Sequence, residues 1–192
     1  MKRQPLTSKA QDLIKEVVLP GDMVIDATLG NGHDTLFLAH LVGPQGAVYG
    51  FDIQQTALTK TLEQLRNNGL ETRVRLFNQG HECMEETLEP DLKGGIRAIM
   101  FNLGYLPGGD KQLTTMQATT RKALESCKSL LAPGGRITII AYTGHPGGAE
   151  EANEVAQWTT SLDASEWLCH SVHPDSNLNN PPRLYCCEKR PL

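Results

Sequence analysis

Short apolar segments alternate with segments of helical periodicity along most of this 192-residue chain. Neighbouring parallel strands need a crossover connection, usually a helix, so the alternation predicts an α/β fold with a doubly wound, mostly parallel sheet. The expected strands of this alternating part are 23–27, 47–52, 74–77, 96–101 and 136–142. The expected helices are 6–18, 33–41, 55–68, a weak helix ending at 88, 113–131 and 149–160.

The last two expected strands, 167–172 and 184–189, break this alternation because only a loop joins them. One of them should therefore enter the sheet antiparallel to its neighbour. A seven-stranded sheet of this kind, with a reversed last strand, resembles the Rossmann-like methyltransferase fold. The length suits a single domain over residues 1–192, in which residues 1–20 form a leading helix.

Charge and cysteine content narrow the classes of function. With 18 Lys+Arg against 22 Asp+Glu, the net charge of −4 gives no global field toward nucleic acid or an anionic membrane. No apolar run is long enough to span a membrane, and residues 1–5 are not followed by the apolar region of a signal peptide. The 5 cysteines form neither a C-x-x-C pair nor a cluster with zinc spacing, so no metal site is expected. We therefore expect a cytoplasmic protein with reduced thiols and no membrane contact.

The stretch 24–35 is the most informative part of the sequence. It is typical of a buried strand, a turn through Gly30-Asn31-Gly32 and the start of a helix, which together present backbone N–H groups to a nucleotide-like ligand. The third glycine of the G-x-G-x-x-G dinucleotide fingerprint is absent, and Asp26 at the strand end would repel a diphosphate. A ligand with positive charge, such as S-adenosylmethionine (SAM) with its ammonium and sulfonium groups, suits this site better.

A second carboxylate supports a cofactor site. Asp52 ends the second expected strand 20 residues after Gly32, about the separation at which a carboxylate binds a ribose diol. The alternatives are an ordinary tight turn, a solvated carboxylate at Asp52, and a helix-capping role for Asp34 and Thr35. The predicted cofactor-binding residues are Asp26, Thr28, Gly30, Asn31, Gly32, His33, Asp52, Gln54, Gln79, His81, Asn102 and Leu103.

The segment Asn102-Leu103-Gly104-Tyr105 resembles the Asn-Pro-Pro-Tyr loop of methyltransferases that act on amino nitrogen. In that arrangement the Asn side chain and a backbone carbonyl accept hydrogen bonds from the acceptor amine, and the aromatic ring stacks on the substrate. A nitrogen nucleophile must be neutral, with its lone pair aimed at the methyl group, so the site supplies position and a fitting electrostatic environment. The alternative is a glycine-rich turn with a core tyrosine.

Two further residues are candidates on the substrate side. His145 has a side chain that titrates near neutrality and could take the acceptor's proton, although a structural role is the alternative. Arg183 could pair with phosphate, and a plain surface arginine is the alternative. The predicted catalytic residues are Asn102, Tyr105 and His145, and the predicted substrate-binding residues are Gly104, Tyr105, Tyr142, His145 and Arg183.

Five segments taken together, 26–35, 51–54, 80–82, 101–110 and 145–148, resemble one small bacterial family. This is the MnmM-type family of tRNA 5-aminomethyl-2-thiouridine methyltransferases, formerly labelled "putative rRNA methylase", and the resemblance covers nearly the whole chain. It implies methyl transfer from SAM to the aminomethyl nitrogen of the wobble uridine in a tRNA anticodon stem-loop, giving 5-methylaminomethyl-2-thiouridine. Since the net charge is acidic, phosphate contacts would need a local patch. Its candidates are Lys2, Arg3, Lys9, Lys111, Arg183, Lys189 and Arg190.

Other functions stay open at this point. The chain could methylate rRNA or a small-molecule amine, or it could be a SAM-binding module without catalysis. An NAD-dependent oxidoreductase is disfavoured by the missing third glycine and by Asp26. A homodimer that buries an apolar face of a late helix is compatible with the sequence.

Overall fold

The computed structural model describes residues 4–110, 112–172 and 181–191, which contain a seven-stranded sheet. Its strands are β1 (Met23–Asp26), β2 (Ala47–Phe51), β3 (Val74–Phe77), β4 (Ile96–Leu103), β5 (Leu131–Ala141), β6 (Trp167–Val172) and β7 (Arg183–Lys189). The strand order is β3-β2-β1-β4-β5-β7-β6, and neighbours from β3 to β5 are parallel. Only β7 is antiparallel to its neighbours β5 and β6. The expected doubly wound sheet with a reversed last strand is therefore confirmed.

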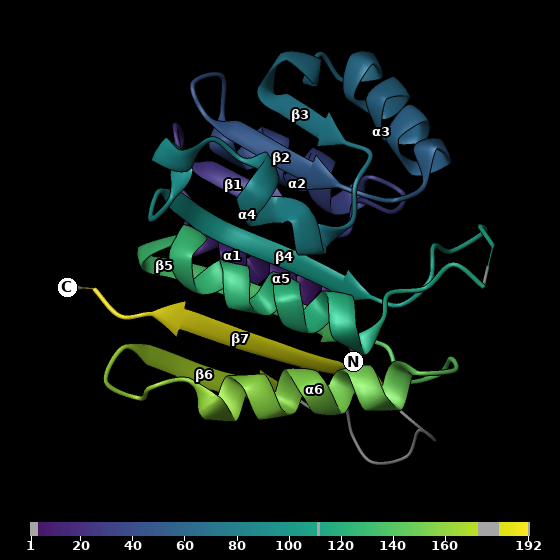
Figure 1. Cartoon of the computed structure of the whole chain (residues 1–192). Helices are drawn as coiled ribbons and strands as arrows, with labels where there is room; N and C mark the ends of the chain where they lie inside the picture. Colours follow the sequence, from purple (N-terminus) through teal and green to yellow (C-terminus); the bar gives the residue numbers. More distant parts are fainter. Residues whose placement is uncertain (1–3, 111, 173–180, 192) are drawn as a thin grey trace.

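Helices cover both faces of this sheet (Figure 1). Side chains alternate along each strand, so Val24 and Met100 pack in one core layer with α1 and α2, whereas Ile25 and Ile99 pack in the other with α5 and α6. Both layers are apolar, as expected for parallel strands that are buried on both faces. The helices are α1 (Leu6–Lys15), α2 (His33–Val42), α3 (Gln55–Asn67), α4 (Met84–Thr87), α5 (Gln117–Leu130) and α6 (Gly148–Ser161), with short 3₁₀ turns η1 (Glu71–Arg73), η2 (His81–Cys83) and η3 (Pro90–Leu92).

The connection between α5 and β5 differs from the expectation. The segment 132–135 was expected to end the helix, but β5 already begins at Leu131 and 132–135 form a bulge opposite β4. Glycine makes this bulge feasible, because Gly134 has φ +72° and a Cβ on Gly135 would lie 2.9 Å from the carbonyl of Arg97.

The start of α5 also differs from the expectation. The helix begins at Gln117 and not at residue 113, because the preceding residues fold back on the end of β4. Tyr105 and Thr114 form an isolated antiparallel bridge, and Thr115 N donates to Gly104 O at 3.0 Å. The described residues 105–110 and 112–116 therefore form a loop that returns to the carboxyl end of the sheet.

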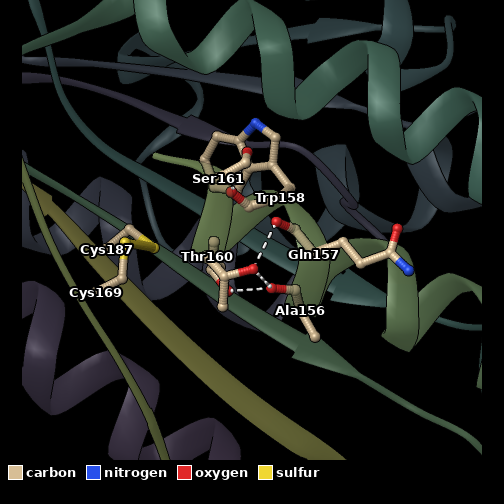
Figure 2. Close-up of a disulfide and its surroundings, with 8 residues drawn as sticks. Ala156, Gln157, Trp158, Thr160, Ser161, Cys169 and Cys187 are labelled. Carbon is tan, nitrogen blue, oxygen red and sulfur yellow. Dashed lines mark hydrogen bonds between the residues drawn. A yellow bond between two sulfur atoms is a disulfide. The ribbon is translucent and has the colours of Figure 1, made fainter. Parts of the chain in front are cut away.

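Two of the cysteines are paired, which corrects the expectation that all thiols are reduced. Cys169 of β6 and Cys187 of β7 lie opposite each other in the strand register and form a disulfide beside α6 (Figure 2). Cys83, Cys127 and Cys186 are free. Within the described residues, no helix has the length and apolar character needed to cross a membrane.

Candidate functional site

A cavity of about 680 Å³ lies at the carboxyl ends of the parallel strands. Its walls come from the segments that follow β1, β2, β4 and β5, together with α1 and η2. In an open α/β sheet, ligands bind outside the carboxyl ends of the strands where the strand order reverses, and here β1 lies between β2 and β4. The cavity is therefore where this fold places a ligand.

The glycine turn after β1 is built on a buried carboxylate. Asp26 is fully buried, and its Oδ2 accepts a hydrogen bond from Thr35 Oγ1 at 2.5 Å while its Oδ1 accepts from Thr28 N at 3.3 Å. The turn closes through Gly32 N, which donates to Leu29 O at 2.9 Å. Asp26 does not line the cavity, so its role is to stabilise the turn through these hydrogen bonds.

Position 32 requires glycine, both because of its backbone conformation and because a side chain has no room there. Its φ is +79°, and a Cβ there would lie 2.6 Å from Oγ1 of the buried Thr61 in α3. We expect Gly32→Ala to lower the free energy of unfolding by about 2–4 kcal/mol, combining left-handed strain with overpacking. Gly69→Ala is the matched control, because Gly69 has φ +66° with nothing within 4 Å of an added Cβ, and should cost about 1 kcal/mol. Urea unfolding of both variants measures the difference, and equal losses would contradict the steric argument.

The pKa of Asp26 is raised from its ordinary 3.8 to about 7, chiefly by burial and next by the negative charge of Asp34. The hydrogen bonds from Thr35 and Thr28 act in the opposite direction. The folded chain therefore holds a proton on Asp26 at pH values where the unfolded chain has already lost it.

This raised pKa predicts how stability depends on pH. The stability that the protonated Asp26 contributes is present below about pH 4 and is lost as the pH rises through the folded pKa of about 7. Since one pKa unit corresponds to about 1.4 kcal/mol, the contribution is on the order of 4 kcal/mol. Asp26→Asn removes the titration, so its urea-derived unfolding free energy should fall less than that of the wild type between about pH 4 and about pH 7. Parallel profiles for the two proteins would contradict this.

Asp52 joins the segments after β1 and β2. Its Oδ2 accepts from Gly30 N at 2.9 Å and its Oδ1 accepts from Gln54 N at 2.8 Å. The side chain lines the cavity, and each carboxylate oxygen has a further lone pair for a ligand hydroxyl. The predicted ribose residue thus also holds the two segments that would surround the ribose.

The segment after β3 contributes a histidine but not the predicted glutamine. His81 is largely buried, lies edge-on to Phe101 at 5.8 Å between ring centroids, and lines the cavity. Burial lowers its pKa, although Glu82 acts in the opposite direction, so the ring is held neutral. Gln79 lies outside the cavity wall and instead accepts a hydrogen bond from Thr87 at 2.5 Å.

Asn102 lies on the last residues of β4, because this strand extends two residues past its expected end. Its backbone N–H donates to Thr28 Oγ1 at 2.6 Å, which ties β4 to the glycine turn. Its side-chain Nδ2 donates to Asp34 Oδ2 at 2.7 Å, and Gln11 Nε2 of α1 donates to Asp34 Oδ1 at 2.7 Å. The Asn102 amide is therefore held in a definite position at the cavity wall.

Aromatic side chains also line the cavity. Tyr105 lies edge-on to His145 at 6.1 Å between ring centroids, and Tyr142 is 39% exposed. His145 Nδ1 lies 3.0 Å from Pro146 O and 3.3 Å from Thr114 Oγ1, so Nε2 is the ring nitrogen left to face a substrate. That Nε2 is buried and has no partner within the described residues. A role as proton acceptor would require this loop to move.

Most of the predicted site residues come together. The cavity wall includes Thr28, Gly30, Asn31, His33, Asp52, Gln54, His81, Asn102, Gly104, Tyr105, Tyr142 and His145. Five predicted residues do not line it, namely Asp26, Gly32, Gln79, Leu103 and Arg183. Leu103 is fully buried in the core, and Arg183 lines a separate cavity of about 510 Å³ between α6 and the β6–β7 pair.

Sequence reasoning missed the contribution of α1 and of the returning loop. Thr7 and Gln11 of α1 reach the cavity wall, and so do Leu113 and Met116. No sequence signal distinguishes Gln11 from other polar positions of an amphipathic helix. Leu113 and Met116 are apolar residues within a polar, glycine-rich segment, and this pattern could have indicated that the segment contributes to a binding site. Their side chains are 44% and 59% exposed.

Residues 48–188 match the model of the family described as "Putative rRNA methylase". The chain belongs to this family. This confirms the resemblance that the five sequence segments indicate. The matched region begins in β2, so the glycine turn at 30–32 lies outside it and its place in the site rests on the contacts described above.

Solved structures described as rRNA methylases or methyltransferases share the whole fold. A "putative rRNA-methylase" from Clostridium thermocellum is 39% identical with a TM-score of 0.92, and the match covers 98% of this chain and 100% of that chain. A "putative methyltransferase" from Streptococcus mutans, solved in complex with SAH, is 35% identical with a TM-score of 0.85, and the match covers 98% and 99%.

A curated relative carries a more specific description. The chloroplastic tRNA (mnm(5)s(2)U34)-methyltransferase of Arabidopsis thaliana is 40% identical over 175 residues, which are 87% of this chain. The chain spans 63% of the length of that relative. This member of the rRNA methylase family thus resembles a tRNA-modifying protein over most of its own sequence.

Proposed function

We propose that this chain is a SAM-dependent N-methyltransferase that methylates the aminomethyl group of wobble 5-aminomethyl-2-thiouridine in tRNA, giving 5-methylaminomethyl-2-thiouridine. The observation that carries the proposal is the Asn102 amide, fixed at the wall of a cavity whose other end is organised by Asp52. The likeness to the Arabidopsis tRNA methyltransferase and to the Streptococcus mutans structure with SAH supports it.

The residues of the cavity fit a nucleoside-based cofactor. Asp52 presents carboxylate lone pairs for two ribose hydroxyls, and the apolar side chains of Phe51 and Ile53 lie beside it. The neutral, largely buried His81 lines the same wall. When bound, SAM supplies the methyl group to the acceptor nitrogen, and the rest of the cofactor leaves as S-adenosylhomocysteine.

The acceptor side is suited to a neutral amine. An amide oxygen at Asn102 accepts a hydrogen bond from an amine N–H and leaves the nitrogen lone pair free. No strong acid or nucleophile is required, because the contribution of the site is orientation and electrostatic fit. The methylated nitrogen then loses a proton to solvent, which also makes the buried Nε2 of His145 unnecessary for this step.

The rim of the cavity suits an extruded base. Tyr105 and Tyr142 are 37% and 39% exposed, and Leu113 and Met116 extend the same apolar rim. Enzymes that modify a base in a folded nucleic acid take it out of the stack and hold it between aromatic or apolar side chains. A wobble uridine in an anticodon loop is already accessible, which lowers the energy needed to extrude it.

The cationic residues proposed for tRNA that the structure describes do not form one patch. Lys189 Nζ donates to Lys128 O at 2.9 Å and Arg190 Nε donates to Ala164 O at 3.1 Å, both at the C-terminal end of β7. Because β7 is antiparallel, that end lies away from the cavity. Lys2, Arg3 and Lys111 lie outside the described residues. Lys9 and Arg183 are thus the described candidates that keep a role in binding the anticodon stem-loop. We place this activity in the cytoplasm. A homodimer stays a prediction.

The proposal is tested by incubating the purified chain with SAM and tRNA that carries 5-aminomethyl-2-thiouridine, followed by mass spectrometry of the nucleosides. We expect conversion to the methylaminomethyl nucleoside. Parallel reactions with rRNA and with free amines identify the other acceptors. Methylation of rRNA alone, of a free amine alone, or binding of SAM without any transfer would each overturn the assigned substrate.

A further inference from the structure

Asp34 is a buried carboxylate between two amides. It lies in the first turn of α2 and is 7% exposed, with Asn102 Nδ2 at 2.7 Å from one oxygen and Gln11 Nε2 at 2.7 Å from the other. Asp34 is the acidic residue of the first turn of α2, as the helix-start alternative expects, but no side chain caps this start and that role leaves the two hydrogen bonds unexplained. The carboxylate instead connects α1, α2 and the end of β4.

This arrangement decides which way the Asn102 amide faces. A carboxylate can only accept, so it selects the NH₂ group of Asn102 and leaves the amide oxygen for another partner. No described residue donates to that oxygen, and Asn102 lines the cavity. An amide turned the other way would present its N–H groups to the cavity and repel the N–H groups of an amine.

We propose that Asp34 is a positioning residue, held by Gln11, that orients the Asn102 amide so that its oxygen accepts a hydrogen bond from the acceptor nitrogen. The inference rests on the proposed function, because it assigns Asn102 to the acceptor amine. Direct removal of the substrate's proton by Asp34 is the competing role, and the two roles predict different results for an isosteric change.

Three variants separate these roles. Asp34→Ala removes the acceptor and should lower kcat about 10- to 100-fold, because the Asn102 amide loses its fixed orientation. In Asp34→Asn the introduced amide oxygen can still accept from Asn102 Nδ2, while Gln11 turns its own amide, so kcat should stay within about threefold of wild type. Asp12→Ala is the control, as Asp12 is an exposed carboxylate that follows Gln11 in α1.

The pH profile of kcat gives a second readout. A positioning role leaves the profile of Asp34→Asn parallel to that of the wild type, because no proton moves to residue 34. A general base at Asp34 would be lost in Asp34→Asn as fully as in Asp34→Ala, together with the ascending limb of the profile. Equal losses in both variants would overturn the positioning role.

A substrate-independent measurement separates this inference from the proposed function. The side-chain NH₂ signals of Asn102, assigned by their loss in Asn102→Ala, should show slow hydrogen exchange in the wild type and in Asp34→Asn but not in Asp34→Ala. If the wild type fails to methylate tRNA while this pattern holds, only the proposed function fails. If tRNA is methylated and Asp34→Ala keeps full kcat, the positioning role fails.

Discussion

Asn102→Ala is expected to lower kcat for methyl transfer by about two to three orders of magnitude, the usual effect of removing one preorganised group from a reacting centre. The affinity for SAM should change less than about threefold, since the loss falls on the acceptor side. The amide of Asn102 is held by Asp34, and its backbone N–H by Thr28, so removing the side chain removes a group that is already in place. Single-turnover assays measure kcat, and calorimetric titration measures the SAM affinity.

Asn68→Ala is a suitable control for this experiment. Asn68 ends α3 on the surface, where its side chain donates to Gln64 O at 2.8 Å. The Asn68→Ala substitution should leave both kcat and the affinity for SAM unchanged. A kcat for Asn102→Ala within about fivefold of wild type would remove Asn102 from the reaction.

Asp52→Ala is expected to weaken SAM binding by about a hundredfold. Hydrogen bonds to a charged group contribute about 1.5–3 kcal/mol each, and each 1.4 kcal/mol corresponds to about tenfold in affinity. The substitution also releases Gly30 N and Gln54 N, so both loops lose the group that joins them.

Asp52→Asn keeps one acceptor oxygen and should give an intermediate affinity. Asp91→Ala, at an exposed carboxylate in η3, is the control for loss of charge alone. Calorimetric titration with SAM checks all three variants. Should Asp52→Ala bind SAM within about threefold of wild type, the ribose assignment would be wrong.

The elements of the fold were predictable where local pattern determines them. A run such as 47–51 is apolar throughout because both faces are buried, and its type follows from that pattern alone. The bulge at 132–135 was not predictable, because it depends on Arg97 of the neighbouring strand, whose guanidinium donates to Pro133 O at 3.1 Å. The Cys169–Cys187 pair likewise depends on the register between two strands and not on the spacing of the cysteines.

The same distinction applies to the site. Asp52 and Asn102 were predictable since residues at the ends of parallel strands meet at one edge of a sheet. The side chain of Arg183 lines the cavity beside α6, which could not be predicted because successive residues of a strand face opposite sides and the sequence does not say which side each one faces. The contact of Gln11 with Asp34 spans 23 residues and exists only after α1 has packed on the sheet. No sequence pattern in α1 or at the start of α2 predicts this contact.

The short hydrogen bond from Asn102 N–H to the Thr28 hydroxyl has a thermodynamic consequence. It joins the segment after β1, on the proposed SAM side of the cavity, to the end of β4, on the proposed acceptor side. Under the proposed function, a coupling between SAM and tRNA through this bond would be reciprocal: the factor by which SAM changes the affinity for tRNA equals the factor by which tRNA changes the affinity for SAM. Thr28 is thus the side chain through which such a coupling would act.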